Sequence, residues 1–326
     1  MILILSTDIY GRKDPIEEWL AYYHASYLRL SVYDLLNSRF TVDADIPKGE
    51  VWVDGTNLCT VVNVVWFRRT VPAPGVLFSQ AFFPSTYYDD LTKEALATLE
   101  FVYHALTRQP IPRYHSKELN KMVMLNKAVG YGLRVPQSRL VSRRKSLAAF
   151  SDLFPDGMVS QPVRGNADYN NKESLESTSF HKVSTIDVHA MPEAFFASLY
   201  REYILPDYKI RIFYLDGHFF PISLLPLANE QNGQSADKRI SAKDAANYQL
   251  KDAESTALKA LLQDLNVNIC TIDMAKKGDD LFLLDINPNG QYIFQSYQDN
   301  TDPERYIAEW LIAENNRRDS MKQLSH

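Results

Sequence analysis

The segment that decides the fold is TIDMAKKGDDLFLLDINPNGQ, residues 271–291. Its two apolar runs with turn residues between them predict a β-hairpin centred near Asp279. Such a hairpin places Asp273 opposite Asp285, and period-two alternation puts Asn287 on the same face as Asp285. Two carboxylates and an amide oxygen would then meet, and hard cations such as Mg²⁺ prefer oxygen ligands. The pattern predicts a magnesium site, and the alternative is a solvated hairpin with surface acids.

Composition sets the broad class of the protein. The chain has 326 residues, 45% hydrophobic and 23% charged, enough for a sizeable core and about two domains. Its 35 Lys and Arg against 40 Asp and Glu give a net charge of -5, which does not favour nucleic acid as a partner. Two cysteines, Cys59 and Cys270, make no disulfide framework and favour a reduced, cytoplasmic setting. No apolar stretch approaches the ~20 residues of a membrane span, and no signal peptide is evident.

Strand and helix signals alternate through the first third of the chain, which is typical of an open α/β sheet. Asp14-Pro15 has the residue types of a helix N-cap and first helical position. A polar bend from Pro110 to His115 marks a candidate domain boundary. The predicted strands are Ile2–Leu5, Tyr27–Val32, Val51–Val53 and Cys59–Phe67, and a long helix is predicted at Thr86–Leu106.

The rest of the chain is predicted to hold a small middle section and a strand-rich last third. The middle section has a helix capped by Ser116 and running to Gly130, strands at Ser138–Val141 and Met158–Val163, and a polar loop at Gly165–Ser179 that is a candidate lid. In the last third, Asp216-Gly217 joins a second hairpin, Tyr208–Leu215 with His218–Leu225. Helices are predicted at Lys145–Leu153, Asp252–Leu265 and Pro303–Glu314, the last followed by a polar tail.

Several common kinds of site are missing from the sequence. It contains neither Gly-x-x-x-x-Gly-Lys-Ser/Thr nor Gly-x-Gly-x-x-Gly, which argues against P-loop and Rossmann nucleotide binding. No nucleophile elbow supports hydrolase chemistry, and the 7 His residues show no metal-ligand spacing. Arg68-Arg69 follows an apolar strand, so it is either a charged edge or part of a ligand crevice.

The string Asp285-Ile286-Asn287-Pro288-Asn289-Gly290-Gln291 resembles the metal-binding signature of ATP-grasp ligases. More narrowly, the chain resembles the graspetide or microviridin-type peptide maturases, in their grasp-with-spasm branch. Trp66-Phe67-Arg68-Arg69, Asn120-Lys121 and the stretch YKIRIFYLDG at 208–217 carry this likeness, which covers nearly the whole chain. It implies an α/β ATP-grasp fold with a pre-ATP-grasp domain at 1–115, a central subdomain at 116–200 and a C-terminal subdomain at 201–326.

The resemblance also implies a set of site residues for ATP and Mg²⁺. Asp273, Asp285 and Asn287 would hold Mg²⁺ against the ATP phosphates, although the family usually has Glu where Asp285 stands. Arg211 would face the terminal phosphate, where a guanidinium fork suits phosphate oxygens. The remaining implied contacts are Lys121 and Arg239 with phosphates, Gln161 and Lys209 within the nucleotide site, and the Glu202-Tyr203-Ile204 backbone with adenine.

Three positions depart from the family pattern. Gln161-Pro162 stands where Lys-Pro is usual, Leu205-Pro206 where a Lys follows the hinge, and Lys209 where an acid faces the ribose. Losing one charged hydrogen bond to phosphate costs about 1.5–3 kcal/mol, or roughly ten- to a hundredfold in binding. Lys209 shares a strand face with Arg211, so it could supply the missing charge. The metal ligands and Arg211 are retained, which favours catalysis.

The implied reaction activates an Asp or Glu side chain of a ribosomally made precursor peptide as an acyl phosphate. A Ser/Thr hydroxyl or Lys amine of the same peptide then forms an ω-ester or ω-amide crosslink, with ADP and phosphate as products. The expected partner is a precursor peptide with its leader, without nucleic acid or membrane, and a homodimer is left open. The alternative is a degenerate, non-catalytic ATP-grasp protein that binds peptide beside an active maturase, motivated by Gln161, Pro206 and Lys209.

Overall fold

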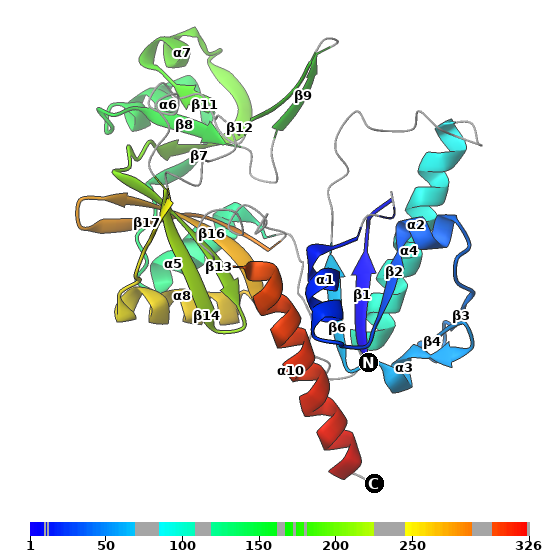
Figure 1. The fold of residues 1–326 in the computed structure, drawn as a ribbon. Helices are drawn as coiled ribbons and strands as arrows, with labels where there is room; N and C mark the ends of the chain where they lie inside the picture. The colour runs from blue at the N-terminus through cyan, green and yellow to red at the C-terminus, as the bar shows by residue number, and fades with distance from the viewer. Residues whose placement is uncertain are drawn as a thin grey trace. The chain divides into compact units, whose positions relative to one another are not determined.

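The chain forms two compact units in the computed structural model (Figure 1). The first unit comprises residues 1–116 and 302–326, and the second comprises 117–301. The C-terminal residues therefore join the first unit, whereas the sequence placed them with 201–301. The structure describes residues 1–9, 11, 13–68, 85–107, 119–161, 167–171, 174–178, 181–224, 245–288 and 302–324.

A parallel sheet forms the centre of the first unit, in the order β2 (Tyr27–Ser31), β1 (Ile2–Ser6), β6 (Val64–Arg68). Every residue of β1 is buried, as expected for a parallel strand covered on both faces. Helix α1 (Pro15–Tyr22) begins as predicted, because Asp14 and Glu17 form a reciprocal capping box. Helix α4 (Ser85–Thr107) also lies where it was predicted.

Two strands predicted in the first unit, Cys59–Phe67 and Tyr27–Val32, are wrong in part. The predicted strand Cys59–Phe67 begins instead as helix α3 (Leu58–Val61), because the Asn57 side chain caps it by accepting from the Cys59 N–H at 2.9 Å. Helix α2 (Val32–Leu36) likewise starts at a Ser31 cap. The neighbouring antiparallel sheet has the order β3 (Val42–Asp45), β4 (Glu50–Val53), β5 (Thr56–Asn57).

The final helix is longer than predicted and has no polar tail at Glu314. Helix α10 spans Pro303–Leu324 and packs on α1, β1 and β6. It buries Ile307, Ala308 and Leu311, which explains why it belongs to the first unit. Near its end, Lys322 Nζ donates to the Thr60 carbonyl at 2.8 Å.

The described part of the second unit contains two larger antiparallel sheets and one two-stranded hairpin. The first has the order β11 (His181–Val183), β8 (Met158–Gln161), β12 (Ala194–Glu202), β7 (Ser138–Arg143). Helices α6 (Arg144–Ser151) and α7 (Thr185–Ala190) lie on one face of it (Figure 1). Its core holds Val141, Leu147, Phe150, Met158, Val183, Val188 and Tyr200.

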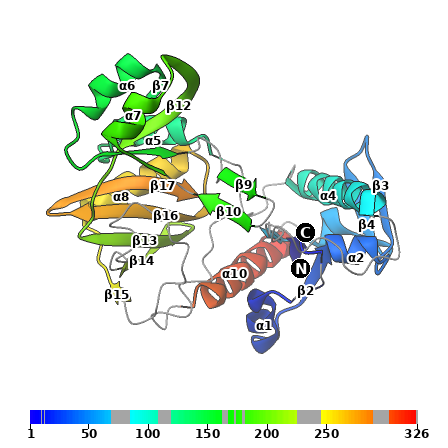
Figure 2. The ribbon, with the colours of Figure 1, turned by 90° about the horizontal axis from the view of Figure 1, so that it is seen from above.

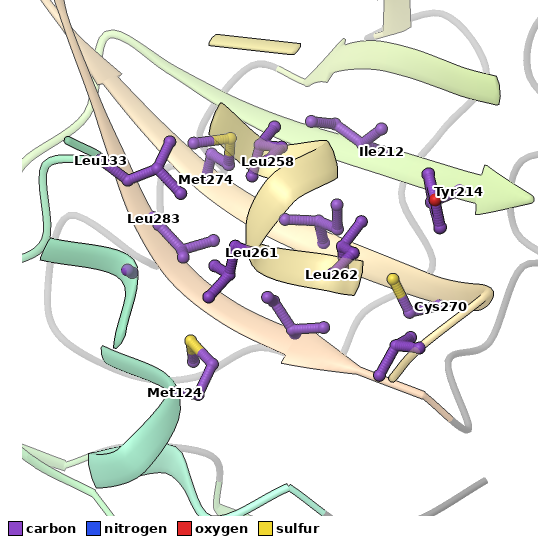
Figure 3. Packing of buried hydrophobic residues seen from close by; sticks show 14 of the residues in the cluster. Met124, Leu133, Ile212, Tyr214, Leu258, Leu261, Leu262, Cys270, Met274 and Leu283 are labelled. Carbon is purple, nitrogen blue, oxygen red and sulfur yellow. The ribbon is translucent and has the colours of Figure 1, made fainter. Parts of the chain in front are cut away.

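The second sheet has the order β15 (Ala245–Asn247), β14 (His218–Leu224), β13 (Tyr208–Leu215), β16 (Ile269–Lys277), β17 (Asp280–Asn287). Helices α5 (Lys121–Gly130) and α8 (Asp252–Asp264) cover one face of it. Figure 3 shows Leu258, Leu261 and Leu262 of α8 packed on this face, with Met124 of α5 beside them. The opposite face carries Arg211 and Asp273 beside buried apolar residues such as Phe213 and Ile222.

Two predictions in the second unit also need correction. Helix α5 begins at Lys121 with Asn120 as its N-cap, so Ser116, which lies outside the described residues, is not the cap. The predicted loop 165–179 contains an antiparallel hairpin, β9 (Ala167–Asn171) with β10 (Ser174–Thr178), visible in Figure 2. Backbone pairing does not require apolar residues, so the polar composition of this segment did not predict its two strands. The bend at Pro110–His115 lies outside the described residues.

Candidate functional site

Asp273 and Asp285 are paired directly across β16 and β17, as the sequence predicted. The register near the turn is different, because Lys277 pairs with Asp280 and Met274 pairs with Leu283. A β-bulge then adds one residue on β17, so that Asp273 meets Asp285 rather than Leu284. Without the bulge, Asp285 would keep the alternation of Leu283 and point into the helix-covered core.

Each of the two carboxylates is bound to a cation. Lys121 Nζ lies 2.8 Å from Asp285 Oδ2, and Arg211 Nε donates to Asp273 Oδ1 at 2.8 Å. The Lys121 side chain is 8% exposed and that of Asp285 is 34% exposed, so the ammonium is the more buried partner. Arg211 lies directly opposite Asp273 on the neighbouring strand β13. The four side chains form a compact cluster with alternating charge.

Burial affects the protonation of this cluster. Removal from water raises the pKa of Asp285 above its ordinary value of 3.8, and the nearby Asp273 carboxylate acts in the same direction. The charge and hydrogen bond of Lys121 oppose this rise, as does the charge of Arg201. Lys121 and Arg201 therefore favour the ionised form of Asp285, although burial keeps its pKa above the ordinary value.

The register also puts Asn287 on the face shared by the two aspartates. Asn287 pairs with Thr271, two residues along each strand from the Asp273–Asp285 pair. Its side chain is exposed. Within the described residues, no group of three or more His, Cys, Asp or Glu side chains could hold a metal ion. Asn287 adds an amide oxygen to the face that carries the two carboxylates.

A second polar set lies on the first sheet of this unit, on the face away from α6 and α7. Gln161 pairs with Leu199, and Arg201 pairs with Val159, so Gln161 and Arg201 share that face. Gln161 Oε1 and Arg201 Nε are buried, and neither has a hydrogen-bond partner among the described residues. Unpaired buried polar atoms are costly, so these two atoms are candidates for contact with a polar group outside the described residues.

The hinge segment after β12 is partly engaged within the protein. The backbone N–H groups of Glu202 and Tyr203 donate to the carbonyls of Gln137 and Gly157, at 2.8 and 3.1 Å. The Lys182 ammonium lies 4.4 Å from the centre of the Tyr203 ring. In the described part of the chain, no group accepts from the Ile204 N–H. Of the predicted hinge, the Ile204 N–H is the one without a hydrogen bond to a described residue, and Ile204 itself is buried.

Known structures of similar fold cover nearly the whole chain. The macrocyclase MdnC of Microcystis aeruginosa MRC, solved with its precursor peptide MdnA, has a TM-score of 0.72 at 17% identity, over 96% of this chain and 100% of that chain. A RiPP-associated ATP-grasp ligase of Chryseobacterium gregarium, solved with ADP and a leader and core peptide, gives 0.72 at 13% identity, over 96% and 97%. The chain has the fold of the ATP-grasp ligases.

A third ATP-grasp ligase, PsnB, was solved with the precursor peptide PsnA2 and AMPPNP. It has a TM-score of 0.71 at 14% identity, over 96% of this chain and 97% of that chain. No family model matches the sequence, and the search of curated proteins gives no match. The α/β ATP-grasp fold expected from the sequence is confirmed by these structures, although their identities to this chain are only 13–17%.

The residues present in this ATP-grasp fold suit Mg²⁺ with a nucleotide phosphate. Asp273, Asp285 and Asn287 offer the hard oxygen donors that Mg²⁺ prefers. Lys121 and Arg211, each 2.8 Å from one of these carboxylates, would offer donors to phosphate oxygens of a bound nucleotide. The cluster therefore contains carboxylates that suit a metal cation and cationic side chains that suit phosphate.

The predicted site residues do not all gather at this point. Lys209 lies on the Arg211 face of β13, opposite Leu224 and Ala275. Arg239 and Arg69 lie outside the described residues. Arg68 is the last residue of β6 in the first unit and forms an ion pair with Asp14 at that end of the parallel sheet. Sequence reasoning missed Arg201, whose one signal is an arginine directly after Leu199-Tyr200 within β12.

Proposed function

We propose that the chain is an ATP-dependent, Mg²⁺-requiring ligase that crosslinks a ribosomally made precursor peptide. The observation that carries this proposal is the Asp273–Asp285 pair, with Lys121 and Arg211 each 2.8 Å from one carboxylate. The fold shared with ligases that were solved with precursor peptides supports it. Within this proposal, residues 1–115 are the pre-ATP-grasp part, 116–200 the central part and 201–326 the C-terminal part, of which 302–326 pack with the first unit.

The charged cluster would act on the terminal phosphate of ATP. Mg²⁺, held by Asp273, Asp285 and Asn287, would neutralise phosphate charge. Arg211 and Lys121 would fix the phosphate oxygens, and Arg239 would assist from its loop. Stabilisation of charge on the transferred phosphoryl group supplies most of the catalysis in such reactions.

The chemistry is the formation and use of an acyl phosphate. An Asp or Glu carboxylate of the peptide attacks the γ-phosphorus, and the bond to ADP breaks. A Ser/Thr hydroxyl or Lys amine of the same peptide then attacks the acyl carbon, loses its proton and expels phosphate. The product is an ω-ester or ω-amide ring, and each ring closure removes one water from the peptide.

The rest of the nucleotide would lie between the two sheets of the second unit. The Ile204 N–H, which has no hydrogen bond to a described residue, would pair with adenine. Gln161 and Lys209 would border the nucleotide from β8 and β13. The leader of the precursor peptide is the proposed partner. No described helix is long and apolar enough to cross a membrane.

A second candidate function rests on the buried amide of Gln161. Its Oε1 atom has no partner among the described residues, although the resemblance leads us to expect a lysine there. With Pro206 and Lys209, this substitution supports a non-catalytic protein that binds peptide beside an active maturase. Such a protein would bind the peptide without consuming ATP.

The two candidates differ in one measurable property, which is ADP formation that depends on the peptide. Wild-type protein is mixed with ATP, Mg²⁺ and the precursor peptide encoded beside it, and ADP is quantified over time. A ligase forms ADP faster with peptide than without it, and Arg211→Gln abolishes the difference. Peptide binding with no ADP formation would reject the ligase and favour the partner.

A further inference from the structure

The position of Asp285 depends on the bulge in β17. Leu281 and Leu283 both lie in the core under α5 and α8, and so does Ile286. Strict alternation from Leu283 would send Asp285 into that core and Ile286 to the polar face. The extra residue, Leu284, reverses the alternation and brings Asp285 opposite Asp273. The metal pair therefore exists only while this bulge is kept.

The bulge is held from outside its own sheet. Arg201 Nη1, on β12 of the other sheet, donates to the Leu284 carbonyl at 3.0 Å. On the preceding residue, the Leu283 N–H donates to the Arg134 carbonyl at 2.8 Å. Leu284 is the residue of β17 without a partner on β16, so the Arg201 bond satisfies its carbonyl, while the Arg134 bond holds the outer edge of β17 next to the bulge.

Arg201 is an unusual residue to find in this place. It is 6% exposed, and its guanidinium lies close enough to Asp285 for the two charges to interact. A buried guanidinium with its rigid fork of donors loses little freedom when it binds a carbonyl. Fully burying a charge is costly, which indicates that the residue has a specific task.

We propose that Arg201 is a positioning residue of the metal site, which holds the Leu284 bulge and thereby aims the Asp285 carboxylate at the metal shared with Asp273. This inference rests on the proposed function, because it concerns the same Mg²⁺. Partners that orient metal ligands typically contribute about 10- to 100-fold to metal affinity. Arg201 acts through Leu284 and does not itself bind the metal.

The competing role is a direct contact between Arg201 and phosphate. Its Nε atom is buried without a partner among the described residues, so it could donate to a nucleotide oxygen. The two roles differ in their dependence on metal. A positioning residue affects binding only when Mg²⁺ is present, whereas a phosphate ligand affects binding with and without Mg²⁺.

The test is calorimetric titration of AMPPNP into the full chain, once with Mg²⁺ and once with EDTA. For Arg201→Gln, we expect affinity with Mg²⁺ to fall about 10- to 100-fold and affinity with EDTA to stay at the wild-type value. Arg201→Lys keeps one donor for the Leu284 carbonyl and should lose less. Hydrogen exchange at the Ile286 amide should speed up in the same order, because the bulge loosens.

Arg139→Gln is the matched control. Arg139 is on the adjacent strand β7 and lies 5.0 Å from the Phe150 ring, on the helix-covered side of the sheet. The Arg139→Gln substitution should leave the AMPPNP affinity unchanged both with Mg²⁺ and with EDTA. Thermal unfolding checks that each variant is folded. If Arg201→Gln does not fold, a Mg²⁺-specific loss of affinity in Arg201→Lys supports the positioning role, and an equal loss with EDTA supports the phosphate contact.

Three results separate the possibilities. Equal losses with Mg²⁺ and with EDTA would overturn the positioning role in favour of a phosphate contact. Wild-type affinity in every folded Arg201 variant would overturn it outright. A wild-type protein whose AMPPNP affinity does not depend on Mg²⁺ would instead reject the proposed function, and with it the site that Arg201 is proposed to serve.

Discussion

Asp285 stands opposite Asp273 across β16 and β17, although Leu283, two residues earlier on the same strand, lies in the core on the other face. One bulged residue, Leu284, separates these two environments. The carboxylate pair is thus a product of the bulge as much as of the hairpin, and it is neutralised by Lys121 and Arg211.

Removing the Asp285 charge should weaken both metal binding and the fold. In Asp285→Asn, the Lys121 ammonium, whose side chain is 8% exposed, keeps its charge but loses its carboxylate. We expect a loss of about 1.5–3 kcal/mol in the free energy of unfolding, the contribution of a charged hydrogen bond. Urea unfolding without nucleotide measures it, and calorimetry should show that Mg²⁺ no longer strengthens AMPPNP binding.

Asp280→Asn is the control on the same strand. Asp280 pairs with Arg134 at 2.7 Å, and the two side chains are 42% and 62% exposed. Such exposed pairs contribute about 0–1 kcal/mol, so its unfolding and Mg²⁺ dependence should resemble those of wild type. Equal effects of the two substitutions would contradict a special role for Asp285.

The raised pKa of Asp285 predicts a pH dependence of metal binding. Burial raises this pKa above 3.8, so in the free protein the carboxyl takes up its proton at a higher pH than an ordinary aspartate. Mg²⁺ needs the ionised form, and the affinity for Mg²⁺–AMPPNP should therefore fall as pH decreases through that raised value. Protonation of the nucleotide affects Asp285→Asn equally, so the difference between the two proteins isolates Asp285. A constant ratio of their affinities from pH 8 to about pH 4, near the ordinary aspartate range, would count against this assignment.

Gln161 and Lys209 test whether a charge has moved within the nucleotide site. If Lys209 replaces the missing lysine, Lys209→Glu alone should weaken AMPPNP binding by about 1.5–3 kcal/mol. The double change Gln161→Lys with Lys209→Glu should keep affinity, with a coupling of about 0.5–3 kcal/mol between the sites. Strict additivity would mean that Gln161 is a lost ligand, which favours the non-catalytic partner.

The hairpin β9–β10 should respond to peptide as well as to nucleotide. Its ten residues pair only with each other in the described part of the chain. We expect hydrogen exchange of its amides to slow when AMPPNP and precursor peptide are both present, and to change little with AMPPNP alone. The same protection with nucleotide alone would contradict a peptide-dependent closure.

The sequence predicted the facing aspartates by a route that the structure corrects. A hairpin centred at Asp279 gives the Asp273–Asp285 pair, but the turn closes at Lys277–Asp280, one residue out of that register. The bulge restores the pair. Its sequence signal is the doublet Leu283-Leu284 followed by Ile286, which breaks the alternation of the strand.

Other features could not be predicted because they depend on contacts distant in sequence. Arg201 meets Leu284 across 83 positions, and only the fold brings a buried arginine to that carbonyl. The length of α10 likewise follows from packing on α1 and β6, which a polar C-terminal composition does not reveal. Local signals succeeded where capping is local, as at Asp14 and Glu17.

The most direct test of the account is the mass of the precursor peptide itself. The peptide encoded beside this chain is incubated with the protein, ATP and Mg²⁺, and its intact mass is compared with that after incubation with Asp285→Asn. The account predicts a loss of one water per ring with wild type, together with ADP formation, and an unchanged peptide with the variant. A peptide that binds wild-type protein and nucleotide but keeps its full mass would contradict it.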